Sequence, residues 1–329
     1  MVTGAAAMRY AGRCPFLQPE VFSAMPPLKP FGTRDNPDTR VYVGDCREVL
    51  PRIAEVAAGT VDLVFADPPF NWKRAYDRWN DDLPEREYLA FTYDWIDLCV
   101  KSLRPGGSLW INIPDDWAAE IVCYLKGRLE RKPPALMLMP NWCIWHYRFG
   151  QNLTERFINS KVHVLYFVKA GAAHTWNPGD VLELSDRAAI YADPRTMNKK
   201  DGMPAGKRVP MDVWYGKYWG RIQGNNKERR ANHDNQLPET YLERVIRSTS
   251  NTGDLVMDPF LGSGTTGVVA RELGRRFIGC EFSPENADSA WKRIQTGPTR
   301  PLTGDSNRST AIFPHRRKGG RARQPMTAE

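Results

Sequence analysis

The chain of 329 residues is 41% hydrophobic, which allows one large α/β domain or a domain with a sizeable insertion. Its formal net charge of +8 favours a polyanionic partner. Six scattered cysteines without a C-x-x-C pair argue against a disulfide framework or a zinc site, and the five histidines show no H-x-x-x-H spacing, so we predict no metal. No apolar run reaches the roughly 18–20 residues of a membrane span and the N-terminus lacks a signal-peptide pattern, so we expect a cytoplasmic protein.

Residues 1–38 are rich in Ala and Pro and lack periodicity, so we predict an extended or partly disordered leader. A short strand over 41–43 and a helix over about 47–58 follow. The apolar run Val61–Ala66 predicts a buried strand that ends at the motif Asp67-Pro68-Pro69-Phe70. Two consecutive prolines have a fixed φ and no N–H, so the chain leaves the sheet in one rigid geometry. The motif therefore places a carboxylate and an aromatic ring at the carboxyl end of a strand, where open α/β sheets bind ligands.

Helices and strands alternate over the next hundred residues. After a loop at 71–84, we expect an amphipathic helix over 85–103 that ends at Arg104-Pro105-Gly106-Gly107. The other elements of this part are a strand over 108–113, a helix over 115–130 and strands over 136–146 and 161–168. Alternation of this kind predicts an α/β fold with a doubly wound, mainly parallel sheet and helices on both faces.

The alternation stops between about 170 and 235, where the sequence becomes polar and basic. From 195 to 230, ten basic residues stand against three acidic ones, with tyrosines and tryptophans between them. The candidate phosphate contacts are Lys199, Lys200, Lys207, Arg208, Arg229 and Arg230. Basic and aromatic residues together suit a nucleic-acid surface, by phosphate neutralisation and base stacking. A solvated loop whose aromatic residues pack locally explains the pattern equally well, so the sequence leaves both interpretations open.

Regular structure resumes at Pro238, which we expect at the start of a helix. A strand over 255–258 is followed by a glycine loop, Gly262-Ser263-Gly264-Thr265-Thr266-Gly267, and by a helix to about 273. We then expect a strand over 276–281 and a helix that Ser283 caps. Residues 296–329 carry seven basic residues against two acidic ones, which predicts a basic disordered tail.

The glycine loop, with Glu281 at the end of the next strand, allows three interpretations. A dinucleotide could place its pyrophosphate on the loop and a ribose hydroxyl on Glu281. A phosphate loop is a weaker match, because no Gly-Lys pair follows. S-adenosylmethionine is the third, since its adenosine needs close approach at glycines and a carboxylate for the ribose diol. Asp258 favours this third interpretation, because a cationic methionine ammonium attracts a carboxylate and a pyrophosphate does not.

These sequence blocks together resemble the DNA amino-methyltransferases, in the permuted group whose catalytic D-P-P-[YF] half precedes the cofactor half. The resemblance rests on GDCREVL (44–50), VDLVFADPPF (61–70), LRPGGSLWINI (103–113), the strand ending in FVK (167–169), QLPETYLERVIRSTSNTGDLVMDPFLGSGTT (236–266) and RRFIGCEFSPENADSAWKRI (275–294). Leu237 departs from the family, since many relatives have Lys there in a Q-K-P sequence. The resemblance implies a methyltransferase domain with a catalytic half (39–169), an inserted target-recognition segment (170–235) and a cofactor half (236–295).

The resemblance also implies roles for individual residues. S-adenosylmethionine would contact the methionine and ribose site at Asp258, Phe260, Gly262, Gly264 and Thr265, with Glu281 on the ribose hydroxyls and Asp45 and Cys46 at the adenine edge. The motif Asp67-Pro68-Pro69-Phe70 would be catalytic. The Asp67 carboxylate and the Pro68 carbonyl would accept the two N–H bonds of an exocyclic amino group and free its lone pair. Phe70 would stack on a base rotated out of the duplex.

The sequence therefore predicts methyl transfer from S-adenosylmethionine to adenine N6 in double-stranded DNA. Asp67 favours adenine, because the cytosine-N4 enzymes of this fold more often carry Ser at this position. The alternatives are cytosine-N4 methylation, a non-catalytic nucleic-acid-binding protein that keeps the cofactor fold, and an NAD-dependent oxidoreductase, which would leave D-P-P-F without a purpose. A homodimer and a cognate restriction enzyme are candidate partners.

Overall fold

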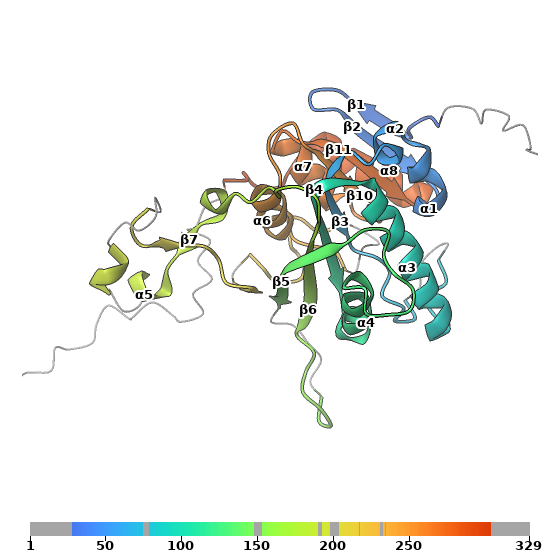
Figure 1. Cartoon of the computed structure of the whole chain (residues 1–329). Coiled ribbons are helices and arrows are strands. Elements are labelled where there is room, and N and C mark those ends of the chain that lie inside the picture. The colour runs from blue at the N-terminus through green and yellow to red at the C-terminus, as the bar shows by residue number, and fades with distance from the viewer. Residues whose placement is uncertain are drawn as a thin grey trace, which may run out of the picture.

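A nine-stranded sheet forms the centre of the molecule (Figure 1). The computed structural model describes residues 28–74, 79–147, 153–189, 193–197, 204–216, 218–230, 233 and 235–303. The predicted tail from 304 onward, most of the predicted leader, and the candidate phosphate contacts Lys199 and Lys200 lie outside these residues.

The strand order of the sheet is β1-β2-β11-β10-β3-β4-β6-β5-β9. Its strands are β1 (Gly32–Arg34), β2 (Thr39–Val43), β3 (Val61–Ala66), β4 (Leu103–Ile113), β5 (Met137–His146), β6 (Lys161–Lys169), β9 (Val213–Trp214), β10 (Leu255–Asp258) and β11 (Arg276–Glu281). The pairs from β2 through β11, β10 and β3 to β4 are parallel, whereas β6 runs antiparallel to both β4 and β5. The prediction of an α/β fold with a mainly parallel sheet is confirmed.

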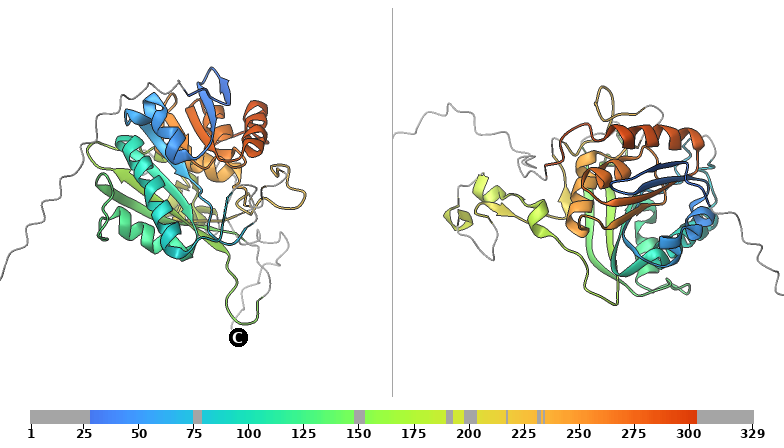
Figure 2. Two further views of the ribbon diagram at one scale, coloured as in Figure 1. Left: turned by 90° about the vertical axis from the view of Figure 1, so that its right-hand side faces the viewer. Right: turned by 90° about the horizontal axis from the view of Figure 1, so that it is seen from above.

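Helices cover both faces of the sheet (Figure 2). The short helices α1 (Cys46–Val49) and α2 (Ala54–Ala57) lie with α3 (Glu85–Ser102) and α4 (Asp115–Leu125) on one face. The helices α6 (Glu239–Thr249), α7 (Thr265–Glu272) and α8 (Pro284–Thr296) cover the other. Buried on both sides, β3 is an apolar run in which Val61, Leu63 and Val64 are fully inaccessible to solvent. Among the described residues, no helix combines the length and apolarity needed to cross a membrane.

Three predicted elements are wrong at their boundaries. The helix expected over 47–58 is instead α1, the 3₁₀ helix Leu50–Arg52 and α2, because Pro51 has no N–H for a continuous helix and Ile53 is extended. The helix expected over 115–130 ends at Leu125, and Gly127 follows with a φ of +64°. The strand expected from Ser108 begins at Leu103, and a register irregularity between the Val61 and Leu63 pairs accommodates the intervening residues.

The segment between β6 and α6 has an outer and an inner part. Its outer part contains the helix α5 (Asp186–Ala189), the 3₁₀ helix Pro194–Met197 and a two-stranded antiparallel sheet of β7 (Glu183–Leu184) and β8 (Lys207–Arg208), which projects beside the main sheet (Figure 1). The 3₁₀ helix Pro178–Val181 precedes this part and lies against α6, where Asn177 at its start donates to the carbonyls of Arg247 and Ser250. Its inner part joins the main sheet, because β9 pairs in parallel with β5. Trp214 and Trp219 are 4% and 2% exposed and pack around Tyr241 of α6. These two tryptophans therefore belong to the core and offer no surface for base stacking.

Candidate active site

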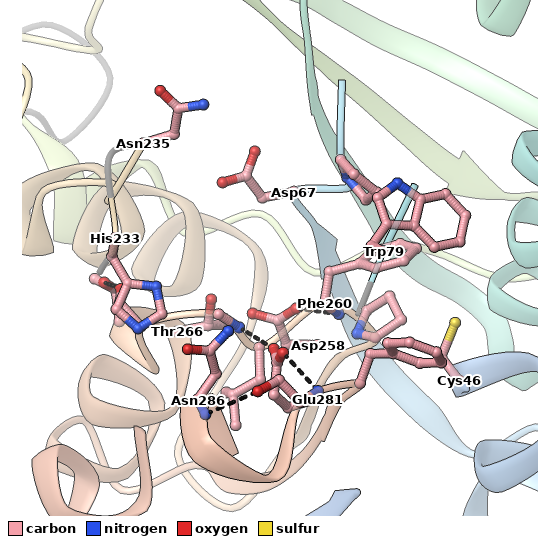
Figure 3. Close-up of a pocket in the computed structure, with 18 of the residues that line it drawn as sticks. Cys46, Asp67, Trp79, His233, Asn235, Asp258, Phe260, Thr266, Glu281 and Asn286 are labelled. Atoms are coloured by element: carbon pink, nitrogen blue, oxygen red, sulfur yellow. Dashed lines mark hydrogen bonds between the residues drawn. The ribbon is translucent and has the colours of Figure 1, made fainter. Parts of the chain in front are cut away.

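A cavity of about 400 Å³ opens at the carboxyl ends of β3, β10 and β11 (Figure 3). Most of the predicted site residues line it, namely Asp45, Cys46, Asp67, Pro69, Asp258, Phe260, Gly262, Thr265 and Glu281. These residues are brought together from both sequence halves, because the parallel order β11-β10-β3 places the ends of their strands side by side. Pro68, Phe70 and Gly264 are not among the lining residues.

Asp67 follows the last residue of β3 and is held by the neighbouring strand. Asn112 of β4 donates a hydrogen bond of 2.7 Å from Nδ2 to Oδ1 of Asp67, and Tyr241 donates one of 3.1 Å to Oδ1 of Asn112. Burial raises the pKa of Asp67 to about 7, with the Asn112 hydrogen bond acting against the rise and the charge of Asp258 adding to it. Asp67 is thus a carboxyl group that can change its protonation state near neutral pH.

Asp258 ends β10 and is a second buried carboxyl group in the cavity. Its Oδ1 accepts the Phe260 N–H at 2.9 Å. Burial raises the pKa of Asp258 to about 7, while hydrogen bonds from Thr266 and Phe260 oppose the rise and the charge of Glu281 adds to it. An uncompensated buried carboxylate is costly, so this position favours a cationic ligand group over an anionic one.

Glu281 ends β11 and is positioned by backbone donors on two sides. Gly262 N donates to Oε2 at 2.8 Å and Ser283 N donates to Oε1 at 3.1 Å. Gly262 has a φ of +50°, a conformation that a side chain would strain. The glycine loop and Glu281 therefore position each other, with the carboxylate at the cavity wall.

Gly264 supports this loop without lining the cavity. It precedes α7 with a φ of +77°, and a Cβ at this position would lie 3.0 Å from the Cβ of Ala290 in α8. Gly264 is thus required for close packing of the loop on α8.

Asp45 and Cys46 line the cavity at the start of α1, just after Val43, which pairs with Glu281 between β2 and β11. Asp45 caps this helix by accepting the Arg47 N–H at 2.9 Å, and its carboxylate pairs with the Arg47 guanidinium at 2.6 Å. Burial alone would raise the pKa of Asp45, but its hydrogen bonds with Arg47 lower it. Burial raises the pKa of the Cys46 thiol to about 12, so Cys46 serves as a small neutral wall residue.

Phe70 is largely buried and is not among the residues that line the cavity. Its side chain is 7% exposed and packs edge-on against Trp72 at 5.1 Å, and its carbonyl accepts a hydrogen bond of 2.9 Å from Trp117 Nε1. The aromatic side chains that do line the cavity are Phe65, Trp79, Phe91, Phe260 and Phe282. Trp79 packs on Phe91 at 4.6 Å, and its buried Nε1 has no hydrogen-bond partner in the described structure.

The predicted phosphate contacts divide into different environments. Lys207 and Arg229 are exposed and Arg230 is half-buried. Arg208 instead forms an ion pair of 3.3 Å with Glu183, which also pairs with Arg244 at 3.2 Å. Lys207 and Arg229 thus lie at the surface and Arg230 lies partly so, while Arg208 has a structural partner.

Several residues of the site are not predicted from the sequence. Asn112 and Tyr241 position Asp67, and His233, Asn235 and Gln236 form part of the cavity wall. A polar Asn112 inside the otherwise apolar WINI strand is the one signal that could have indicated its role. Among the described residues, no cluster of three or more His, Cys, Asp or Glu could hold a metal ion.

A sheet edge with a glycine loop, a carboxylate held beside that loop and a separate D-P-P-F carboxylate is the arrangement expected of an α/β DNA amino-methyltransferase. Comparison with known proteins supports this class. A model of the DNA methylase family N6_N4_Mtase matches residues 61–292. The chain therefore belongs to this DNA methylase family, as its sequence blocks predict.

Curated relatives are similar over most of this chain. Type II methyltransferase M.BamHI of Bacillus amyloliquefaciens is 34% identical over 264 residues, which are 79% of this chain and 58% of the relative. Type II methyltransferase M1.MboII of Moraxella bovis is 32% identical over 259 residues, 76% of this chain and 94% of the relative. DNA adenine methyltransferase YhdJ of Escherichia coli (strain K12) is 30% identical over 259 residues, 75% of this chain and 80% of the relative. The chain thus spans less than two thirds of the first relative and most of the other two.

Solved structures share the fold at lower identity. The structure of the cytosine-N4-specific PvuII DNA methyltransferase has a TM-score of 0.57 at 18% identity, and the match covers 82% of this chain and 96% of the PvuII chain. The M1.HpyAVI-SAM complex has a TM-score of 0.54 at 20% identity and covers 78% of this chain and 98% of its own. Both confirm the predicted methyltransferase-type α/β fold.

Proposed function

We propose that this chain is a site-specific DNA methyltransferase that transfers a methyl group from S-adenosylmethionine to N6 of an adenine rotated out of the duplex. The observation that carries the proposal is the position of Asp67. It lies in the cavity that Asp258 and Glu281 also line, and its Oδ1 is already held by Asn112. One oxygen is thereby left to accept a hydrogen bond from a substrate amino group.

The cavity residues fit S-adenosylmethionine in charge and shape. Two buried carboxyl groups favour a cationic ligand, and the backbone at Gly262 carries no side chain to prevent close approach. We assign Asp258 to the methionine ammonium, Glu281 to the ribose hydroxyls, and Asp45 with Cys46 to the adenine edge. Phe260 and Thr265 complete the wall of this part of the cavity. The bound cofactor supplies an electrophilic methyl group on its sulfonium sulfur.

The residues of the chain activate the acceptor. The lone pair of an exocyclic amino group is delocalised into the ring, so this group is a poor nucleophile. Asp67 Oδ2 and the Pro68 carbonyl accept its two N–H bonds, which moves the nitrogen toward sp³ geometry and frees the lone pair. The Asp67 carboxylate stabilises the positive charge that develops on nitrogen and accepts the proton that is released, directly or through water. Pro69 adds a rigid second proline, which fixes the Pro68 carbonyl.

Adenine is proposed over cytosine because Asp67 supplies a full negative charge at the position that activates the amino group. The name of the relative YhdJ, a DNA adenine methyltransferase, supports this choice. The fold does not discriminate between the two bases, since the PvuII enzyme with this fold is cytosine-N4-specific. Duplex DNA is proposed as the substrate, with residues 170–235 as its recognition segment and Lys207, Arg229 and Arg230 as phosphate contacts. A homodimer, a cognate restriction enzyme and the outer domain boundaries stay predictions.

The test is to incubate the pure protein with S-adenosylmethionine and unmethylated amplified DNA and to analyse the nucleosides by mass spectrometry. We expect N6-methyladenine, and none with the Asp67→Ala variant. N4-methylcytosine alone would overturn the base assignment, whereas no methylated nucleoside would favour a non-catalytic nucleic-acid-binding protein.

A further inference from the structure

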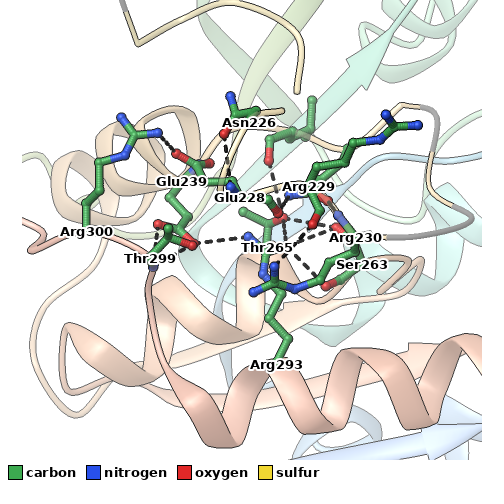
Figure 4. A network of polar contacts seen from close by, with 12 residues as sticks. Asn226, Glu228, Arg229, Arg230, Glu239, Ser263, Thr265, Arg293, Thr299 and Arg300 are labelled. Carbon is green, nitrogen blue, oxygen red and sulfur yellow. Dashed lines mark hydrogen bonds and ion pairs between the residues drawn. The ribbon is translucent and has the colours of Figure 1, made fainter. Parts of the chain in front are cut away.

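A buried arginine, Arg293, forms hydrogen bonds with the glycine loop (Figure 4). Arg293 of α8 is fully inaccessible to solvent at its side chain. Its Nη1 donates to Ser263 O at 3.1 Å, to Ser263 Oγ at 3.2 Å and to Thr265 Oγ1 at 2.7 Å. Ser263 and Thr265 both line the cavity, so Arg293 holds part of the cavity wall without touching the space itself.

The same guanidinium binds the start of the helix that follows the inserted segment. Nη2 of Arg293 donates to Oε1 of Glu239 at 3.1 Å. Glu239 is the first residue of α6 and is 2% exposed, and its carboxylate also accepts the Thr299 N–H at 3.1 and 3.0 Å. Arg293 therefore connects the glycine loop to the N-terminus of α6 through one rigid planar group.

A second buried carboxylate extends this network into the inserted segment. Glu228 is 1% exposed, its Oε2 accepts the Glu239 N–H at 2.9 Å, and its Oε1 pairs with Arg300. The Glu228 carbonyl accepts a hydrogen bond from Gln236, which lines the cavity. Glu228 directly precedes Arg229 and Arg230, the two proposed phosphate contacts at this end of the segment.

We propose that Arg293 is a positioning residue for the cofactor site and that, through Glu239 and Glu228, it couples cofactor binding to DNA binding. The inference rests on the proposed function, because it assigns the glycine loop to the cofactor and Arg229 and Arg230 to DNA. DNA phosphates that bind Arg229 and Arg230 restrain the adjoining Glu228 and, through Glu239 and Arg293, the glycine loop. The cofactor then has less motion of this loop left to restrict. DNA therefore tightens cofactor binding, and the cofactor tightens DNA binding by the same factor.

The coupling can be measured without the methyl-transfer reaction. S-adenosylhomocysteine is titrated into the full chain by calorimetry, with and without unmethylated amplified duplex DNA. The wild-type protein should bind it more tightly in the presence of DNA. Arg293→Met keeps the length of the side chain and removes its hydrogen bonds, so the Kd should rise about tenfold or more and the tightening by DNA should fall toward a factor of one.

Arg275→Met is the matched control. Arg275 is also buried, at 5% exposure, but its guanidinium binds Ser250 and Leu273, and it does not line the cavity. This variant should also lose stability, because it too loses the hydrogen bonds of a buried guanidinium. It should keep the wild-type Kd for S-adenosylhomocysteine and the wild-type tightening by DNA. If Arg275→Met lost as much cofactor affinity and as much tightening by DNA as Arg293→Met, Arg293 would act only through general stability, and the proposal would be overturned.

Glu228→Gln keeps the experiment decisive if Arg293→Met does not fold. It retains the shape of the side chain and removes its charge, so it should change the DNA-free affinity much less than the tightening by DNA. Wild-type coupling in this variant would overturn the link to the inserted segment. A wild-type protein that binds S-adenosylhomocysteine but transfers no methyl group to DNA would contradict the proposed function instead. The effect of Arg293→Met on the Kd measured without DNA would still decide whether Arg293 positions the cofactor site.

Discussion

Asn112 and Asp67 meet between β4 and β3, with Asn112 Nδ2 2.7 Å from Asp67 Oδ1. The orientation of the Asn112 amide is fixed because its own oxygen accepts the Tyr241 hydroxyl at 3.1 Å. Asn112 is 1% exposed and Tyr241 is fully buried, so water does not compete for these bonds. Asp67 is therefore held in one orientation before any substrate is bound, which is the condition for electrostatic preorganisation.

We expect Asn112→Ala to shift the pH dependence of methyl transfer. The Asn112 hydrogen bond acts against the rise in the pKa of Asp67, so its removal should raise that pKa further above about 7. A hydrogen bond to a charged group contributes roughly 1.5–3 kcal/mol, or about one to two pKa units. Because the carboxylate form is the active one, the acid limb of kcat should move to higher pH, and activity at pH 9 should suffer less than at pH 7. Tyr241→Phe should shift the limb less, and an unmoved limb in Asn112→Ala would contradict this role.

Asp67→Asn and Asp258→Asn should affect different steps, catalysis and cofactor binding respectively, although both remove a carboxyl group from the same cavity. Asp67→Asn should lower kcat by roughly 10²–10³-fold, the cost of removing one preorganised electrostatic group, and leave the Kd of S-adenosylhomocysteine nearly unchanged. Asp258→Asn should mainly weaken cofactor binding. Single-turnover kinetics and calorimetry on both variants give the comparison. Near-normal turnover in Asp67→Asn would exclude its assignment to the target base.

Glu281→Ala should weaken cofactor binding about tenfold or more, since hydrogen bonds that ribose hydroxyls donate to a carboxylate contribute roughly 1.5–3 kcal/mol. The variant should also lower the Tm, because the N–H groups of Gly262 and Ser283 lose their acceptor. Asp288→Ala, which removes an exposed ion pair with Lys292 on α8, is the surface control and should change neither quantity measurably. Unchanged affinity in Glu281→Ala would mean that the ribose is held elsewhere.

Cofactor binding at neutral pH should release protons. Burial raises the pKa of both Asp67 and Asp258 to about 7, so each carboxyl group is partly protonated there. A cationic ligand favours the carboxylate form and lowers these pKa values, so protons leave on binding, up to about half a proton per group at pH 7. Calorimetry of S-adenosylmethionine binding in two buffers of different ionisation enthalpy measures the release. The release should vanish by pH 9 and fall by about half in Asp258→Asn. Net proton uptake at pH 7 would contradict the assignment.

The salt dependence of DNA binding should separate phosphate-binding side chains from structural ion pairs. Removing one side chain that neutralises a phosphate should reduce the slope of log K against log salt by about 0.9 on duplex DNA. Arg229→Ala and Lys207→Ala should show this change in fluorescence anisotropy with a labelled duplex. Arg208→Ala should not, because its guanidinium pairs with Glu183 at 3.3 Å. Equal slopes in all three variants and the wild type would place the DNA-binding residues in another segment.

Much of the fold is predictable because its strands are continuous apolar runs that end at distinctive residues. Asp67, Asp258 and Glu281 each lie at or directly after the end of such a run, so their meeting at one sheet edge follows from the parallel order. Local chemistry explains two of the wrong boundaries, since a single Pro51 divides one predicted helix and Gly127 follows the early end of another. These are effects of one residue on a pattern that is otherwise helical.

The residues that support the site are harder to predict, because their roles depend on contacts distant in sequence. Asn112 lies in a strand, Tyr241 shows only helical periodicity, and Arg293 looks like one of many surface charges. Trp214 lies in a basic stretch that reads as polar, yet it packs in the core against Tyr241. A local sequence pattern shows neither the partner of such a side chain nor its depth in the fold.

The pairing of β9 with β5 limits how new target specificities can be obtained from this chain. Replacing the whole of 170–235 with a segment from a relative would remove an edge strand and two core tryptophans from the host. A chimaera with its junctions at β7 and β8 would exchange only the outer part and keep both. The part of the insertion that is free to diversify is therefore shorter than the insertion itself, and its inner part must be inherited together with the catalytic domain.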